Sequence, residues 1–244
     1  MGYSPTLAVG TAAFEIIAAG WAFALARAKG RGDRAVAFTT GVILFLLAGY
    51  QLTEVAICSD VAAAGFLPRL AFSIVTWLPA LGLLLIAQIR WPRSRALYGC
   101  AIGMLALSVG VVVWIALDPS FASASVCNAV YARYAHAQPR FQLYAIYYWV
   151  GLLGMILLSG HGMLASVEPR GRRLLAHVLT GTLGFILPSI AVSHFVPETR
   201  YALPSVLCHF ALILAMMLAR MLWVLRVAPA EATELTEDAP GARI

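Results

Sequence analysis

The sequence predicts an all-α membrane protein, a seven-transmembrane-helix bundle, on the basis of three observations. Of its 244 residues, 61% are hydrophobic and only 11% are charged, and the mean hydropathy is +0.85. A water-soluble domain carries about 25% charged residues, because its surface has to be solvated. The hydrophobic residues are grouped in seven long runs, and the basic residues gather in every second loop between them. Lipid is therefore the expected solvent for most of the chain.

The seven runs each have the length of a membrane-spanning helix. About 20 residues at 1.5 Å rise per residue match a hydrocarbon core of about 30 Å, whereas β-barrel strands are about 10 residues long and alternate strictly. The first run has no basic segment before it, so we interpret it as the first helix rather than as a cleaved signal peptide. Gly99 and Gly103 form a G-x-x-x-G motif in run four, which predicts close helix packing within the bundle, with a homodimer seam as the alternative. The predicted spans cover residues 6–26, 35–57, 68–89, 96–117, 143–166, 174–195 and 201–225.

The distribution of Lys and Arg predicts the orientation of the bundle. Twelve of these residues lie in the loops after runs one, three and five and at the end of run seven, whereas the opposite loops hold four, namely Arg69, Arg133, Arg140 and Arg200. Short loops rich in Lys and Arg stay in the cytoplasm. The sequence therefore predicts an N-terminus outside and a C-terminus in the cytoplasm. Because this topology accounts for the net charge of +6, no nucleic-acid partner is expected.

The chain divides into a seven-helix transmembrane domain over residues 1–226 and a C-terminal tail over residues 227–244. The tail combines Pro and Ala with four acidic residues, Glu231, Glu234, Glu237 and Asp238. Such a composition cannot bury a hydrophobic core. We therefore expect a disordered acidic tail on the cytoplasmic side.

The longest loop, residues 118–142, lies outside in this topology and is the one loop large enough to form a cap. We expect a short interfacial helix over residues 129–137. Cys58, at the outer end of run two, and Cys127, in this loop, both fall in outer segments, where an oxidising compartment allows a disulfide. The pair is therefore a disulfide candidate, with two free thiols as the open alternative.

Ionisable groups inside the predicted spans are few, and each costs about 2.5–3.5 kcal/mol at the centre of a membrane helix on insertion scales. Glu15 lies midway along run one. Gln51 and Glu54 lie near the outer end of run two, and their spacing to each other and to Cys58 places all three on one helix face. Such residues either bind a ligand or hold the bundle together by interhelical hydrogen bonds.

Run seven adds polar residues in the same outer half. It enters from the outside, so Cys208 and His209 lie about 12 Å deep at 1.5 Å per residue. His194 lies near the outer end of run six. We expect these side chains to converge with those of runs one and two in a pocket for a small molecule, a proton or a metal ion, with structural hydrogen bonding as the alternative. The predicted ligand-binding residues are Glu15, Gln51, Glu54, Cys208 and His209.

Two histidines lie in the inner half. His161 is close to the inner end of run five, and His177 is close to the inner start of run six. Consecutive helices are usually neighbours, and axial haem ligands come from facing helices. Bis-histidine haem is therefore one hypothesis, and its ordinary counterpart is a pair of interfacial histidines beside a basic loop. A transition-metal site would draw on His161, His177, His194 and His209.

Several classes of protein are excluded by the sequence. The only lysine is Lys29, in a predicted cytoplasmic loop, so no buried amine can form a retinal Schiff base. The chain has no H-E-x-x-H, G-x-S-x-G or P-loop motif. No run carries the repeated arginines of a voltage sensor. Binding is therefore expected rather than enzymatic activity.

Three short motifs carry a resemblance to a known group of proteins. They are Gln51-Leu52-Thr53-Glu54, Trp77-Leu78-Pro79 and Pro204-Ser205-Val206-Leu207-Cys208. In these motifs and in its order of helices the chain resembles uncharacterised bacterial seven-helix membrane proteins, which carry Gln-x-x-Glu at the end of helix two and Ser-Val-x-Cys in the last helix. The resemblance implies a protein of the bacterial inner membrane and directs attention to Gln51, Glu54 and Cys208, but it brings no activity with it.

The expected function is to bind a small ligand or ion in an outward-facing pocket within the membrane, without a cofactor, as a receptor, a sensor or a transporter does. The spans show no clear inverted repeat, and seven helices do not divide into two equal halves, which counts against transport. A sensor would act through a membrane or cytoplasmic protein partner, because no run of sequence suggests an output domain. The alternatives are a haem- or metal-bearing redox or enzymatic protein and a structural subunit of a membrane complex.

Overall fold

A computed structural model of the chain describes the seven spans and parts of the loops between them. The described residues are 5–59, 66–90, 95–128, 132–136, 139–165, 168–196, 199 and 202–227. The acidic tail lies outside the described residues, apart from Val227 at the end of the last helix. Its predicted disorder therefore stays a prediction.

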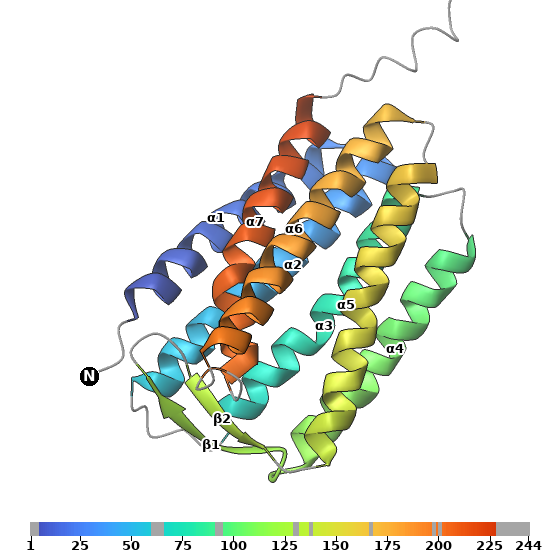
Figure 1. The fold of residues 1–244 in the computed structure, drawn as a ribbon. Coiled ribbons are helices and arrows are strands. Elements are labelled where there is room, and N and C mark those ends of the chain that lie inside the picture. The colour runs from blue at the N-terminus through green and yellow to red at the C-terminus, as the bar shows by residue number, and fades with distance from the viewer. Residues whose placement is uncertain are drawn as a thin grey trace, which may run out of the picture.

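The described residues form seven long helices and a two-stranded hairpin (Figure 1). All seven helices are long and apolar enough to cross a membrane, which confirms the predicted all-α bundle. The helices run side by side, and the hairpin lies across one end of them (Figure 1). In chain order the elements are α1 Thr6–Ala28, α2 Arg31–Cys58, α3 Leu67–Arg90, α4 Arg95–Leu117, β1 Ala122–Cys127, β2 Ala132–His136, α5 Arg140–Ala165, α6 Pro169–Phe195 and α7 Leu203–Val227.

Helix α3 is the central helix of the bundle, since it packs against α2, α4, α5 and α6 and against β1. Small residues allow the close approach of α3 and α5. A side chain at Gly82 of α3 would collide with Met155 of α5, and one at Gly151 of α5 would collide with Pro79 of α3. Close backbone approach at small residues is the usual way in which helices associate in a membrane, where the hydrophobic effect does not draw them together.

Helix α4 lies at the edge of the bundle and corrects one prediction. A side chain added at Gly99 or Gly103 would meet no described atom within 4 Å, so the predicted packing of this G-x-x-x-G motif within the bundle is wrong. The face that does contact the bundle carries Ser108, whose hydroxyl is 2.7 Å from the Tyr147 hydroxyl of α5. The motif permits close packing of helices, but the position of α4 beside α3 decides which face of α4 is covered.

The outer loop contains a β-hairpin where a helix was expected. Strand β1 pairs antiparallel with β2, so the predicted interfacial helix over 129–137 is wrong for residues 132–136, which are the part of that segment that the structure describes. In β2, Ala132 and Tyr134 are buried and Arg133 between them is half-buried. This alternation has the period of a strand, in which successive side chains point to opposite faces.

Aromatic contacts hold the hairpin against the bundle. The ring of Phe72 in α3 lies edge-on to Phe121, at the start of the hairpin, and to Tyr134 of β2, with ring centroids 5.4 and 5.2 Å apart. Tyr144 of α5 adds a third edge-on contact to Phe72 at 5.5 Å. Edge-to-face aromatic pairs add about 0.5–1.5 kcal/mol each beyond the area that they bury. The hairpin is therefore packed onto the bundle as part of its core.

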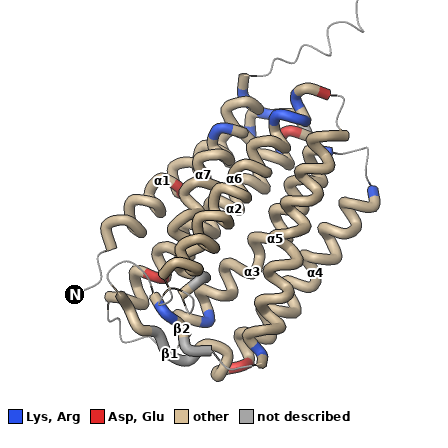
Figure 2. Tube along the Cα trace, viewed as in Figure 1, with Lys and Arg blue, Asp and Glu red and all other residues tan. Residues whose placement is uncertain are grey.

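The two ends of the bundle differ in charge, and most Lys and Arg residues lie at the end opposite the hairpin (Figure 2). We call the end that carries β1 and β2 the hairpin end and the opposite end the arginine end. The described basic residues of the hairpin end are Arg69, Arg133 and Arg140, and those at or near the arginine end include Arg27, Lys29, Arg34, Arg90, Arg95, Arg170, Arg172, Arg173, Arg220 and Arg226.

An ion pair joins two parts of the bundle at each end. At the arginine end the Arg170 guanidinium lies 2.7 Å from the Asp33 carboxylate and ties α6 to α2. At the hairpin end Arg140 lies 2.7 Å from Asp118 and ties α5 to the end of α4. Hydrogen bonds from Ser120, together with the Arg140 guanidinium, hold the pKa of Asp118 below its ordinary value of 3.8.

Candidate functional site

The candidate site is a buried polar cluster where α2, α7 and the hairpin meet. Helix α2 contributes Tyr50, Gln51 and Glu54, which are 1%, 1% and 0% exposed. Glu54 follows the other two by four and three residues, so all three side chains lie on one side of the helix. Helix α2 packs against α7 and β1, so these polar groups are enclosed by protein.

Glu54 is linked to the hairpin through a serine. The Ser205 hydroxyl of α7 donates a hydrogen bond of 2.8 Å to Oε1 of Glu54. The same Ser205 oxygen accepts a hydrogen bond of 3.2 Å from the backbone N–H of Ala132 in β2. Ser205 is fully buried. The orientation of the Glu54 carboxyl therefore depends on the position of the hairpin.

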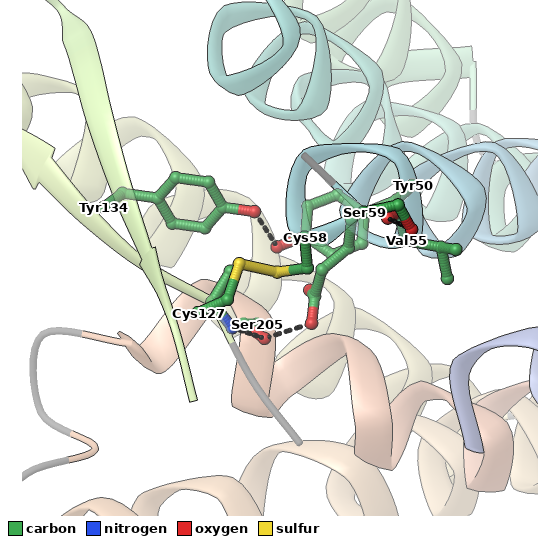
Figure 3. Close-up of a disulfide and its surroundings, with 9 residues drawn as sticks. Tyr50, Val55, Cys58, Ser59, Cys127, Tyr134 and Ser205 are labelled. Carbon is green, nitrogen blue, oxygen red and sulfur yellow. Dashed lines mark hydrogen bonds between the residues drawn. A yellow bond between two sulfur atoms is a disulfide. The ribbon is translucent and has the colours of Figure 1, made fainter. Parts of the chain in front are cut away.

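A covalent bond and a second hydrogen bond join the hairpin to α2 at the same place (Figure 3). A disulfide connects Cys58 at the end of α2 to Cys127 at the end of β1, with Cα atoms 5.7 Å apart. The hydroxyls of Tyr50 and Tyr134 lie 3.2 Å from each other, and the Tyr50 hydroxyl also lies beside the Glu54 carboxyl. The hairpin is therefore a cover over the cluster that is tied to α2 both covalently and by hydrogen bonding.

Helix α7 brings the predicted residues Cys208 and His209 to this cluster, where they join Gln51 of α2. The Gln51 side-chain amide donates a hydrogen bond of 2.6 Å to the backbone carbonyl of Cys208. Nδ1 of His209 lies 2.8 Å from the carbonyl oxygen of Ser205. A carbonyl only accepts, so Nδ1 carries the proton in this bond. The half-buried His209 ring is thus bonded to the same residue that donates to Glu54.

Glu15 of α1 lies deeper along the same seam. It is 0% exposed. Helix α1 packs against both α2 and α7. The structure therefore adds a second buried carboxyl group, on a helix that contacts both helices of the cluster.

Four side-chain oxygens of these residues have no hydrogen-bond partner among the described residues. They are both carboxyl oxygens of Glu15, Oε1 of Gln51 and Oε2 of Glu54. Buried polar atoms in native proteins nearly always have a partner in the protein or in ordered water, and exceptions call for an explanation. Carboxylate and amide oxygens accept hydrogen bonds or coordinate cations. The cluster is therefore equipped to receive a hydrogen-bond donor or a positive charge.

An enclosed cavity borders the cluster. It has a volume of about 30 Å³ and reaches Cys208 and Tyr148. The remaining lining is mostly aliphatic, from α2, α3, α5, α6 and α7. A water molecule needs at least about 10–15 Å³ of such volume together with polar partners. Glu15, Gln51 and Glu54 do not line this cavity, so it is an apolar space beside the cluster and not its ligand pocket.

The other predicted histidines lie elsewhere. His194 is exposed near the end of α6, where its ring lies edge-on to Phe195, so it is not part of the buried cluster. His161 is exposed on α5, and Nδ1 of the half-buried His177 lies 2.6 Å from the Arg173 carbonyl of its own helix. No group of three or more His, Cys, Asp or Glu residues that could hold a metal occurs in the described parts of the chain. Haem and metal binding remain untested predictions.

Three residues of the cluster were not predicted as site residues from the sequence. Tyr50 precedes Gln51 and lies on the same side of α2 as Glu54, and Ser205 stands four residues before His209, one helical turn away. These spacings are visible in the sequence and could have identified Tyr50 and Ser205 as members of the cluster. Tyr134 has no such signal, because it reaches Tyr50 only after the hairpin has formed, across 84 residues of chain.

Comparison with protein families and with curated proteins identifies no relative of this chain. No protein-family model matches the chain, and no curated protein matches its sequence. The resemblance to bacterial seven-helix membrane proteins therefore stays a prediction. The function has to be argued from the cluster and from the two ends of the bundle.

Proposed function

We propose that the chain is a multi-pass protein of the bacterial inner membrane that binds a small cation or a hydrogen-bond-donating ligand in the cluster beneath its hairpin. The seven apolar helices support insertion in a membrane. The excess of Arg at the arginine end supports an orientation with that end in the cytoplasm and the hairpin end outside. A disulfide at the hairpin end is consistent with an oxidising outer compartment.

The observation that carries the proposed ligand class is the set of four unpartnered oxygens on Glu15, Gln51 and Glu54. All four are acceptors, so the matching ligand donates hydrogen bonds or carries positive charge. A buried carboxylate without a partner is costly in an apolar environment. A bound cation, such as a metal ion or a protonated amine, would offset that cost. An anionic ligand would instead be repelled.

The role that fits such a site is that of a receptor, a sensor or a transporter rather than of an enzyme. The cluster lies beneath the hairpin and is enclosed by it. Ligand entry from the outside therefore requires the hairpin or the start of α7 to move. A bound ligand that stabilises one position of the hairpin would convert binding into a change of shape at the outer surface.

The proposal is tested by thermal unfolding of the detergent-purified full chain. The probes are the chlorides of sodium, potassium, magnesium and calcium, with methylamine and choline, at constant ionic strength. We expect at least one probe to raise the unfolding midpoint of the wild type, because a ligand at one hundred times its Kd adds about 2.7 kcal/mol of stability. Glu54→Gln should abolish this shift, since it removes the charge and keeps the size of the side chain.

The matched control is Glu168→Gln, the same substitution at an exposed residue of the opposite end. It should leave the probe-induced shift unchanged. The proposal fails if no probe shifts the wild type, or if Glu54→Gln responds as the wild type does. It also fails if Glu54→Gln does not fold, because the carboxyl group would then be a structural element.

A further inference from the structure

A groove lies between α1 and α2 near the arginine end. It has a volume of about 370 Å³ and is lined by Phe23, Ala26, Arg27, Arg34 and Phe38. Ala26 is buried, both arginines are exposed, and the Phe38 ring is 55% exposed. The groove thus combines two cationic groups with an apolar floor.

The helix periodicity produces this arrangement from both sides. Phe23 and Arg27 are four residues apart in α1, and Arg34 and Phe38 are four residues apart in α2, so each arginine lies one helical turn from a phenylalanine. The two helices run in opposite directions, and in both the arginine is nearer the arginine end. The two rings lie 5.6 Å apart, and Phe23 packs over Gly41, where a side chain would approach its ring to 2.8 Å.

The two guanidinium groups are available to a ligand. Neither Arg27 nor Arg34 takes part in an ion pair in the part of the chain that the structure describes. Asp33, which directly precedes Arg34, is already held by Arg170 at 2.7 Å. The groove therefore presents uncompensated positive charge.

We propose that this groove is a binding site for an anionic phospholipid of the membrane leaflet at the arginine end. The lipid phosphate would lie between the Arg27 and Arg34 side chains, whose planar guanidinium groups bind phosphate oxygens in pairs. The acyl chains would lie along Phe23 and Phe38, one turn further into the bundle. Basic pockets between transmembrane helices on the cytoplasmic side are the typical sites of anionic headgroups. The site rests on the proposed membrane insertion and orientation, and not on the ligand of the hairpin end.

Native mass spectrometry of the detergent-purified full chain tests the proposal. The probes are phosphatidylglycerol and phosphatidylcholine with the same acyl chains. We expect phosphatidylglycerol to be retained in preference to phosphatidylcholine. A basic residue near a membrane surface contributes a factor of about five in affinity for anionic lipid. Arg27→Gln or Arg34→Gln alone should therefore weaken retention about fivefold, and the double variant at least tenfold.

The matched control is Arg95→Gln, which removes an exposed arginine of the same end outside the groove. It should retain phosphatidylglycerol as the wild type does. Inorganic phosphate in excess should not displace the lipid, because it cannot occupy the apolar floor.

A second groove at this end, which includes Arg172 and Arg173, also offers two cations. The substitutions at Arg27 and Arg34 should therefore remove one bound lipid and leave others in place.

Three results would overturn the site. They are equal retention of the two lipids by the wild type, unchanged retention by the double variant, and displacement by inorganic phosphate. A failure of membrane insertion would look different, since neither lipid would then be retained by any form of the chain. That result would count against both proposals, whereas equal retention of both lipids would count against the groove alone.

Discussion

The hairpin end and the arginine end handle charge in opposite ways. At the hairpin end, Glu54 is fully buried and is connected through Ser205 to the backbone of the hairpin, and Glu15 is fully buried midway along α1. At the arginine end, Arg27 and Arg34 remain exposed on the bundle. A buried charge needs partners close to it, whereas an exposed arginine can be solvated by water or by lipid headgroups. This difference is the basis of the proposed ligand site beneath the hairpin and of the proposed cytoplasmic orientation of the arginine end.

The two ends also differ in how they are closed. The hairpin end has a disulfide between residues 69 positions apart, an aromatic cluster and long-range hydrogen bonds. At the arginine end, the polar contacts between described elements include the half-exposed ion pair of Arg170 with Asp33 and a hydrogen bond of 3.5 Å from Lys29 to the carbonyl of Arg226. In the part of the chain that the structure describes, the cover over a buried polar cluster lies at the hairpin end.

The largest expected effect on stability comes from removing the disulfide of the hairpin end. Removing the disulfide with Cys58→Ser should lower the free energy of unfolding by about 2–5 kcal/mol, because the cross-link closes a long loop in the unfolded chain. Thermal unfolding of the detergent-purified protein measures the effect. Cys127→Ser should have the same effect, and the double variant should be no worse than either single one. Cys100→Ser, at an exposed free cysteine of α4, is the control and should change nothing. Unfolding of the double variant at the wild-type midpoint would contradict the structural role of the disulfide.

A smaller effect tests the noncovalent link between Glu54 and the hairpin. Ser205→Ala removes the donor to Glu54 and the acceptor of the Ala132 N–H, and leaves both groups buried. Leaving buried groups unsatisfied costs about 1–3 kcal/mol, so the free energy of unfolding should fall by that amount.

Ser189→Ala is the matched control for Ser205→Ala. Ser189 is equally buried, but its hydroxyl bonds only to the Phe185 carbonyl in its own helix. Its substitution should cost less than Ser205→Ala in the same unfolding measurement. Equal losses in the two variants would show that Ser205 serves its own helix and not the hairpin.

The smallest effect concerns the exposed ion pair at the hairpin end. Hydrogen bonds from Ser120 and the charge of Arg140 lower the pKa of Asp118. The carboxylate therefore adds stability above its ordinary pKa of 3.8, and this contribution is lost as the pH falls through the lower folded value. Asp118→Asn should remove this part of the acid sensitivity, measured as a smaller drop of the unfolding midpoint between pH 5 and pH 3. An unchanged pH profile would contradict the assignment.

Much of the fold followed from local sequence, and part of the site did as well. Runs of apolar residues predict helices without knowledge of their neighbours, because each helix satisfies its own backbone hydrogen bonds. Gln51 and Glu54 could be placed on one helix face by their spacing alone. Residues 132–136 were assigned wrongly, because a strand is stabilised by a partner strand that local periodicity does not reveal. The covered face of α4 was also assigned wrongly, since Gly99 and Gly103 permit close packing without selecting a neighbour.

Three features of this protein follow from its amino-acid sequence alone: the seven apolar helices, the charge difference between their ends and the presence of polar residues within the spans. These are properties of single segments, set by composition and by the 1.5 Å rise of a helix. Three others appear only in the folded bundle: Ser205 meets Glu54 across 151 residues, the hairpin covers both, and Arg27 and Arg34 share one groove. These pairings depend on which helices become neighbours, and that choice is made by the packing of the whole bundle.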